Sequence, residues 1–277
     1  MQIDSILFYR YLMAVIGLAV LMVVKKESFR IQKADIPMLL VMGLLFGVSS
    51  FTLFESYNYL SAGIASTILF VYPVFVTIIM ALVFKEKVSI LTVTAIILAF
   101  TGITILYKDD SGATLSMTGI VWIICSALTY ALYIVGVNKS RIHTMSGLKL
   151  TFYSILIGFL FFWVKLQFGF AVQPMAKPEL WLNAAALGLF PTVVSCMAMV
   201  SAVHYVGSTP TAVLGAMEPV TAVAISAIAF AEPLTFRIVS GVLLIIAAVT
   251  LIILGDQLIK PLYHALKLLP IHNHLRK

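Results

Sequence analysis

Long apolar segments separated by short polar stretches run almost the whole length of the chain. Each is about as long as the 20 residues that a helix needs to cross the hydrocarbon core of a bilayer. Backbone groups in lipid must be hydrogen-bonded within their own segment, so each segment is predicted to be a helix. The sequence therefore predicts an all-α polytopic membrane helix bundle with nine transmembrane helices, at residues 5–24, 36–54, 62–84, 88–107, 116–137, 149–168, 180–203, 208–231 and 234–255.

The composition agrees with this interpretation. Of the 277 residues, 62% are hydrophobic and only 10% are charged, and the mean hydropathy is +1.09. A water-soluble domain of this size could not cover so much apolar surface. The two cysteines, Cys125 and Cys196, both lie in apolar segments, so we expect no disulfide framework, metal site or cofactor.

The net charge of +7 is interpreted as a topology signal and not as a nucleic-acid-binding surface. If the helices alternate in direction, thirteen Lys and Arg lie on one side of the membrane and four on the other. The basic side is predicted to be cytoplasmic, so the C-terminus lies inside and the first helix begins outside. We expect a multi-pass protein of the cytoplasmic (inner) membrane whose partners are lipid and a small-molecule substrate. Its oligomeric state stays open, with a homodimer among the alternatives.

The two halves of the chain align with each other without a gap when one is shifted by 146 residues. Pro73 then falls on Pro219 and Glu86 on Glu232, so that a proline and a glutamate thirteen residues apart recur in one register. Matched segments cross the membrane in opposite directions, which is an inverted-topology repeat. Such repeats place substrate and ion sites near the midplane, where the halves meet.

The fifth predicted helix, 116–137, has no mate in this alignment. We expect an ancestral 5+5 arrangement of which this chain shows 4+5, so that the first helix of the first half is missing. The alternative is a genuine nine-helix protein. The expected units are an incomplete first repeat (1–110), a second repeat (111–255) and a basic, amphipathic cytoplasmic tail (256–277) that lies on the inner leaflet.

Around the matched proline and glutamate residues of its two halves, the chain resembles the EamA-type transporters of the drug/metabolite transporter superfamily. The resemblance rests on Tyr72-Pro73-Val74-Phe75 leading to Lys85-Glu86-Lys87, on Glu218-Pro219-Val220 leading to Ala231-Glu232-Pro233, and on the segment from Tyr59 to Ser66. It implies a ten-helix fold of two five-helix halves that exports or exchanges small metabolites. It does not select a substrate.

Glu218 is the sharpest functional candidate, because an ionisable group inside a membrane span is costly and usually faces a partner or a wet cavity. Pro219 beside it removes a backbone donor and favours a broken helix. We expect Glu218 to bind a proton or a cationic substrate group; the alternative is that it satisfies polar groups at the kink. Its repeat mates, Tyr72 and Pro73, are expected to lie at the same pathway.

Arg10 and a stripe on the fifth helix complete the candidate pathway. Arg10 is expected to bind an anionic group or to pair with Glu55, or else to extend to the outer interface. The stripe of Trp122, Ser126, Thr129, Tyr130 and Tyr133 shares one helical face, which either lines a cavity or packs against a neighbouring helix. Ser195 is a weaker candidate.

The sequence favours a secondary transporter that works by alternating access, with proton coupling as an option. A membrane-embedded enzyme would need a nucleophile with a base, or a His/Asp cluster, at membrane depth. His204 is the only histidine in or near a predicted span, so no enzymatic activity is expected. A non-transporting scaffold or degenerate relative remains the main alternative.

Overall fold

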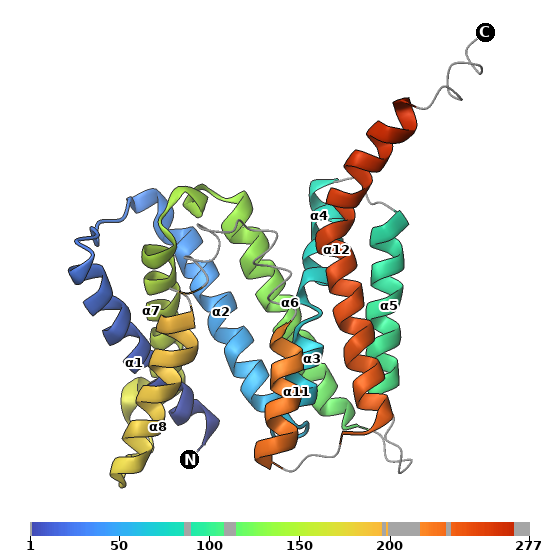
Figure 1. The fold of residues 1–277 in the computed structure, drawn as a ribbon. Coiled ribbons are helices and arrows are strands. Elements are labelled where there is room, and N and C mark those ends of the chain that lie inside the picture. The colour runs from blue at the N-terminus through green and yellow to red at the C-terminus, as the bar shows by residue number, and fades with distance from the viewer. Residues whose placement is uncertain are drawn as a thin grey trace.

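The computed structural model describes residues 2–85, 90–107, 115–195, 198, 217–230 and 234–268. Over these residues the protein is an all-α bundle, which confirms the predicted fold class (Figure 1). Its helices are α1 (Ile3–Val24), α2 (Ile36–Ser56), α3 (Ala62–Leu69), α4 (Tyr72–Phe84), α5 (Ile90–Tyr107), α6 (Met117–Lys139), α7 (Gly147–Lys165), α8 (Pro178–Gly188), α11 (Met217–Phe230) and α12 (Phe236–Leu268).

Among the described residues, five helical segments are long and apolar enough to cross a membrane. They are α1, α2 with the short turn before it, α3 together with α4, α6 and α7. Shorter apolar stretches lie within α5, α11 and α12. Many large apolar side chains on these helices are exposed, among them Ile90 and Ile228. A lipid-facing helix surface should have this character, because the bilayer covers it.

The third predicted span is not one helix but two. α3 ends at Leu69 and α4 begins at Tyr72, with Phe70 and Val71 between them. Pro73 explains the position of the break. Its nitrogen cannot donate to the carbonyl of Leu69, four residues earlier, and its ring would clash with that carbonyl. The interruption places irregular backbone inside a span, at a point where Val71 is fully buried in protein.

The seventh predicted span, 180–203, is also irregular. α8 passes at Gly188 into a π-helical turn, η4 (Leu189–Val194), which contains Pro191. A proline cannot supply the ordinary i→i−4 hydrogen bond, and a π-turn is one way to absorb the missing donor. Apart from Ser195 and Ala198, the remainder of this predicted span lies outside the described residues.

α11 and α12 correspond to the last two predicted spans. Residues 208–216 lie outside the described residues, and the described part of α11 begins at Met217, so the position of Glu218 within the whole predicted span stays a prediction. α12 runs to Leu268, thirteen residues beyond the predicted end of the span. Residues 256–268 thus continue α12 as a helix, and their position on the inner leaflet stays a prediction.

Three buried clusters hold the helices together. One joins α3, α4, α5 and α12, with Ile68 and Ile245 at its centre. A second joins α1 and α7 with η4. A third joins α2, α7 and the segment after α6. α6 contacts the first cluster through Ile123 and the third through Val137, so it connects the two sides of the bundle (Figure 1).

The helix contacts follow the internal repeat. α1 packs on its mate α7 and α5 on its mate α12, and α3 of the first half packs on α11 of the second. The contact between α2 and α7 is matched by the contact between their mates, α8 and α1. Each of these pairs joins one half of the chain to the other, so the halves interlock and do not form separate domains.

Candidate functional site

An aromatic cluster lies where α2, α4 and α6 meet. The rings of Tyr72 and Tyr130 are 4.8 Å apart between centroids and meet edge to face, and Tyr133 stacks on Tyr130 at 6.1 Å. Phe46 of α2 completes it, 5.3 Å from Tyr133. The structure therefore brings together three of the aromatic residues predicted from the sequence. The sequence did not single out Phe46, because one phenylalanine in an apolar helix carries no signal of its own.

Tyr11 of α1 extends this cluster towards the second half of the chain. Its ring lies 6.4 Å from Phe46 and 5.2 Å from Phe162 of α7. Its hydroxyl donates to Ser50 Oγ at 2.7 Å. The side chain is almost fully buried, so this hydrogen bond satisfies a polar group that lipid or protein would otherwise leave unpaired.

Ser126 and Trp122, the other stripe residues on α6, contact α2. Ser126 Oγ donates to the Ser49 carbonyl at 2.8 Å, and Ser49 Oγ donates to the Ser126 carbonyl at 3.0 Å. Trp122 meets Phe51 edge to face at 6.0 Å. Thr129 bonds back to carbonyls of its own helix. Ser126 thus takes part in a helix–helix contact, whereas Tyr130 and Tyr133 belong to the aromatic cluster.

Glu218 is exposed at the start of the described part of α11, and Pro219 beside it is buried. α11 packs on α3 of the other half, and the Gly63 N–H of α3 donates to Ser226 Oγ at 3.3 Å. The Glu218 carboxylate lies within electrostatic range of Tyr72 and of Tyr57, the residue that follows α2. That Glu218 and its mate Tyr72 share one pathway stays a prediction.

Arg10 does not form the ion pair with Glu55 that was one of its expected roles. Glu55 instead accepts a hydrogen bond from Asn58 Nδ2 at 3.2 Å. The Arg10 guanidinium lies over the ring of Phe54, 5.3 Å from its centroid, and its buried Nε has no hydrogen-bond partner among the described residues. The Arg10 guanidinium also lies within electrostatic range of the Tyr57 hydroxyl.

Ser195 is exposed at the end of η4, and the structure places no other candidate beside it among the described residues. Glu86, Glu232 and His204 lie outside the described residues. Within the described part of the chain, no group of three or more His, Cys, Asp or Glu side chains is arranged to hold a metal ion.

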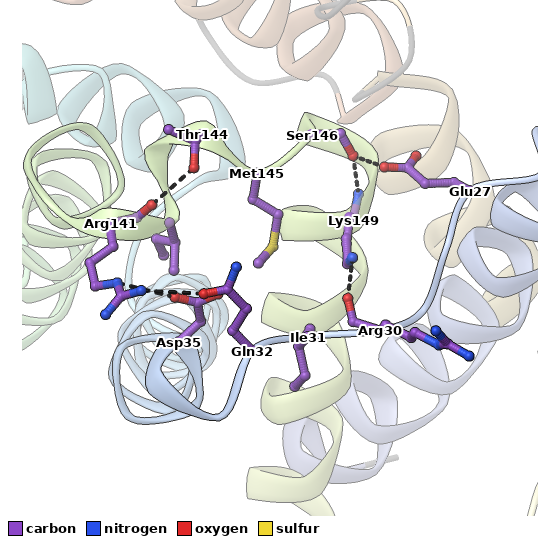
Figure 2. Close-up of a pocket in the computed structure, with 11 residues that line it drawn as sticks. Glu27, Arg30, Ile31, Gln32, Asp35, Arg141, Thr144, Met145, Ser146 and Lys149 are labelled. Atoms are coloured by element: carbon purple, nitrogen blue, oxygen red, sulfur yellow. Dashed lines mark hydrogen bonds and ion pairs between the residues drawn. The ribbon is translucent and has the colours of Figure 1, made fainter.

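A polar pocket of about 280 Å³ opens at the end of the bundle that carries the basic loops. It lies between the α1–α2 loop and the α6–α7 link (Figure 2). Arg141 Nε lies 3.5 Å from Asp35, and its Nη2 donates to Gln32. On the other side Ser146 donates to Glu27, and Lys149 donates to the Arg30 carbonyl. No pattern in the sequence indicated these contacts, because their partners are more than a hundred residues apart.

The opposite end of α1 is also tied to the second half of the chain. Lys165 Nζ lies 2.7 Å from Asp4 and 3.5 Å from the centroid of the Phe51 ring. The Gln173 N–H donates to Ser5 Oγ at 3.1 Å, and Tyr9 donates to the Gln173 carbonyl. The start of α1 and the loop that follows α1, both in the first half, are therefore bonded to residues of the second half.

Proteins with similar sequences support a transport role. Over 199 residues the chain is 26% identical to the uncharacterized transporter YvbV of Bacillus subtilis, covering 70% of this chain and 64% of YvbV. An uncharacterized transporter of Archaeoglobus fulgidus is 25% identical over 227 residues, which is 81% of this chain and 80% of that protein. The chain thus spans somewhat less than two thirds of the length of YvbV.

A solved crystal structure shares the fold, with a TM-score of 0.61 and 14% sequence identity, covering 90% of this chain and 86% of that one. The EamA-like transporter family matches residues 1–108 and 117–254, which together make up nearly the whole chain. The chain is therefore a multi-pass membrane protein that belongs to the EamA-like transporter family.

Proposed function

We propose that this protein is a secondary transporter that exports or exchanges a small metabolite across the cytoplasmic membrane by alternating access, with its C-terminus inside. The observation that carries the proposal is Glu218. It is a carboxylate at the start of α11, within electrostatic range of Tyr72, where the two halves of the repeat meet. An ionisable group at such a place is a transport site by default.

The interlocked repeat supports alternating access. Since mates such as α1 and α7 pack on each other and run in opposite directions, two equivalent arrangements of the halves can open the shared site to opposite sides. Two ion pairs between the halves, Asp4–Lys165 at the start of α1 and Asp35–Arg141 just before α2, are polar contacts that such a change would have to keep or exchange.

Glu218 also supplies a coupling mechanism. A carboxylate cannot hold a proton and a cationic group of the substrate at the same time. Each state of the carrier would therefore move one or the other, and an inward proton gradient would drive the substrate outward. Transport of either species also neutralises Glu218, which lowers the cost of its passage through the low-dielectric interior.

Everted membrane vesicles test this proposal. We expect a solute from a panel of amino acids, amines and dyes to accumulate in vesicles with the wild-type protein when the interior is made acid. Glu218→Gln should abolish accumulation, because the amide cannot exchange a proton for a cation. Glu55→Gln is the matched control and should accumulate solute at the wild-type rate, since Glu55 lies at the end of α2 and bonds only to Asn58 among the described residues.

Equal accumulation by wild type and Glu218→Gln would contradict the coupling role of this residue. Absence of accumulation for every solute, with the protein shown to be inserted and folded, would favour the scaffold alternative over transport.

A further inference from the structure

The turn that follows α7 presents aromatic side chains to its surroundings. This turn, η3 (Gln167–Gly169), contains Phe168, and Phe170 comes directly after it. Phe170 exposes 92% of its surface, the largest fraction of any large apolar side chain among the described residues, and Phe168 exposes 61%. Two exposed rings so close together are unfavourable in water, and such a patch marks a surface that something apolar covers.

The backbone of η3 is held in a conformation that most side chains disfavour. The φ angle is +53° at Gln167 and +57° at Phe168, which is the left-handed region. A residue with a Cβ atom rarely adopts this region, and it stays there only where the surrounding structure requires it. The Leu166 carbonyl accepts hydrogen bonds from the N–H groups of Gly169 and Ala171, each at 3.1 Å. The turn therefore has a defined shape, and in that shape its phenylalanines lie on the outside.

The lipid-facing surface of α7 continues into this turn. Leu160 and Val164 are exposed on α7, which is one of the helices long and apolar enough to cross a membrane. Trp163, on the same part of the helix, meets Phe168 edge to face with 5.3 Å between ring centroids. Since lipid covers the exposed face of a membrane-spanning helix, the aromatic turn extends a surface that is already in contact with lipid.

The length of α7 places the turn at the edge of the hydrocarbon core. α7 has 19 residues, which span about 28 Å at 1.5 Å per residue, close to the ~30 Å thickness of that core. Lys165, the last residue of α7, forms its ion pair with Asp4 at this level. Trp181, beyond the turn, donates its indole N–H to the Met175 carbonyl at 3.3 Å. Amphipathic rings of this kind are enriched where the membrane meets water.

The corresponding loop at the other end of the bundle has a different chemistry. Because α1 is the repeat mate of α7 and α2 that of α8, the α1–α2 loop is the counterpart of the α7–α8 loop. Its one aromatic residue, Phe29, packs on Phe152 at 5.5 Å, and its charged groups include Lys25, Lys26, Arg30 and Lys33. Basic groups suit an anionic leaflet surface, whereas exposed phenylalanines suit the boundary between headgroups and acyl chains.

We propose that residues 166–173 form a membrane anchor, in which Phe168 and Phe170 insert among the lipids of the leaflet at the end of the bundle opposite the basic loops. The occupant of this surface is lipid. Gln173 bonds the anchor to Ser5 and Tyr9 of α1, so the anchor also holds the start of α1 at a fixed depth. This inference does not depend on the proposed transport function.

The depth of a nitroxide label tests the anchor in the full chain. Cys125 and Cys196 are replaced by alanine, Phe170→Cys is spin-labelled, and the protein is reconstituted in vesicles of phosphatidylethanolamine and phosphatidylglycerol. Relaxation of the label by oxygen, which concentrates in lipid, is compared with relaxation by a water-soluble nickel chelate. Labels at Val20→Cys, exposed on α1, and at Ser28→Cys, exposed in the α1–α2 loop, give the lipid and water references.

We expect the label at residue 170 to show the oxygen excess of the Val20 reference. The nickel accessibility of the Ser28 reference would place the turn in water and overturn the proposal. Low accessibility to both reagents would also overturn it, because a protein surface, such as a second copy of the chain, would then cover the turn.

A double variant tests the two rings themselves, with the label moved to Ala171→Cys, next to them and exposed. Phe168→Ser with Phe170→Ser should shift this label from oxygen towards nickel accessibility, because the turn loses the apolar groups that insert. Val23→Ser with Val24→Ser, a pair of exposed apolar residues at the other end of the bundle, is the matched control and should leave the label unchanged. An unchanged label in the phenylalanine variant would show that these rings do not anchor the turn.

Discussion

Two serines join α2 to α6 by a reciprocal pair of hydrogen bonds. Each hydroxyl donates to the backbone carbonyl of the other residue, at 3.0 and 2.8 Å, and both side chains are buried. Small hydroxyl residues allow close approach of helices in a membrane and provide the polar contact that replaces a hydrophobic driving force. This pair fixes the helix that connects the two sides of the bundle.

We predict that Ser49→Ala and Ser126→Ala each destabilise the protein by about 0.5–1.5 kcal/mol, the range measured for hydrogen bonds between membrane helices. The double variant should lose less than the sum, because each change weakens the same contact. Unfolding in mixed micelles with increasing sodium dodecyl sulfate measures these values. Thr94→Ala is the control, since Thr94 is exposed and its hydroxyl donates to the Ile90 carbonyl of its own helix. Strict additivity would show that the two serines do not act as a unit.

Proline has different effects in different helices of this protein. Pro73 separates α3 from α4, and Pro191 lies in the π-turn that follows α8. Pro37 lies in the first turn of α2, where a missing N–H costs nothing. The break before Pro73 is the one that adjoins the aromatic cluster, through Tyr72.

We predict that Pro73→Ala joins α3 and α4 into one helix, because alanine can donate to the Leu69 carbonyl. The continuous helix should be more stable by about 1–3 kcal/mol, and transport should fall several-fold because Tyr72 is displaced from its contact with Tyr130. Hydrogen exchange over residues 69–73 and the vesicle assay together measure both effects. Pro37→Ala is the matched control. Faster transport by a straightened helix would show that the break is not needed for function.

At the scale of the whole molecule, the polar pocket and the basic loops lie at one end of the bundle. The start of the chain and the α7–α8 loop lie at the other end (Figure 1). The pocket contains Arg30, Arg141 and Lys149, whereas the opposite end pairs its Lys165 with Asp4. The asymmetry of positive charge that orients a membrane protein is therefore built into the folded structure.

We predict that the basic end faces the cytoplasm. A fluorescent protein fused after Lys277 should fluoresce, because it folds inside the cell. Alkaline phosphatase fused after Lys177, in the α7–α8 loop, should be active, because it needs the outer, oxidising side. Exchanging the two reporters should silence both. Activity in the exchanged pair would invert the topology and contradict the positive-inside assignment.

The class of fold, the positions of most spans and the repeat could all be predicted from the order of amino acids alone. Lipid permits few alternatives to a helix, so a run of about 20 apolar residues suffices to place one. The repeat is visible because the matched Pro73 and Pro219, and the matched Glu86 and Glu232, keep one register.

The contacts of the polar residues, and the choice of which prolines interrupt a helix, became known only from the packed bundle. α12 continues through Pro261, while α3 ends before Pro73, although proline removes the same backbone donor at both places. Likewise, Arg10 packs over the ring of Phe54, and Glu55 accepts a hydrogen bond from Asn58 and does not pair with Arg10. These outcomes depend on neighbours distant in sequence, which supply or withhold partners for the freed backbone and side-chain groups. Pairing of this kind leaves no periodic pattern along the chain.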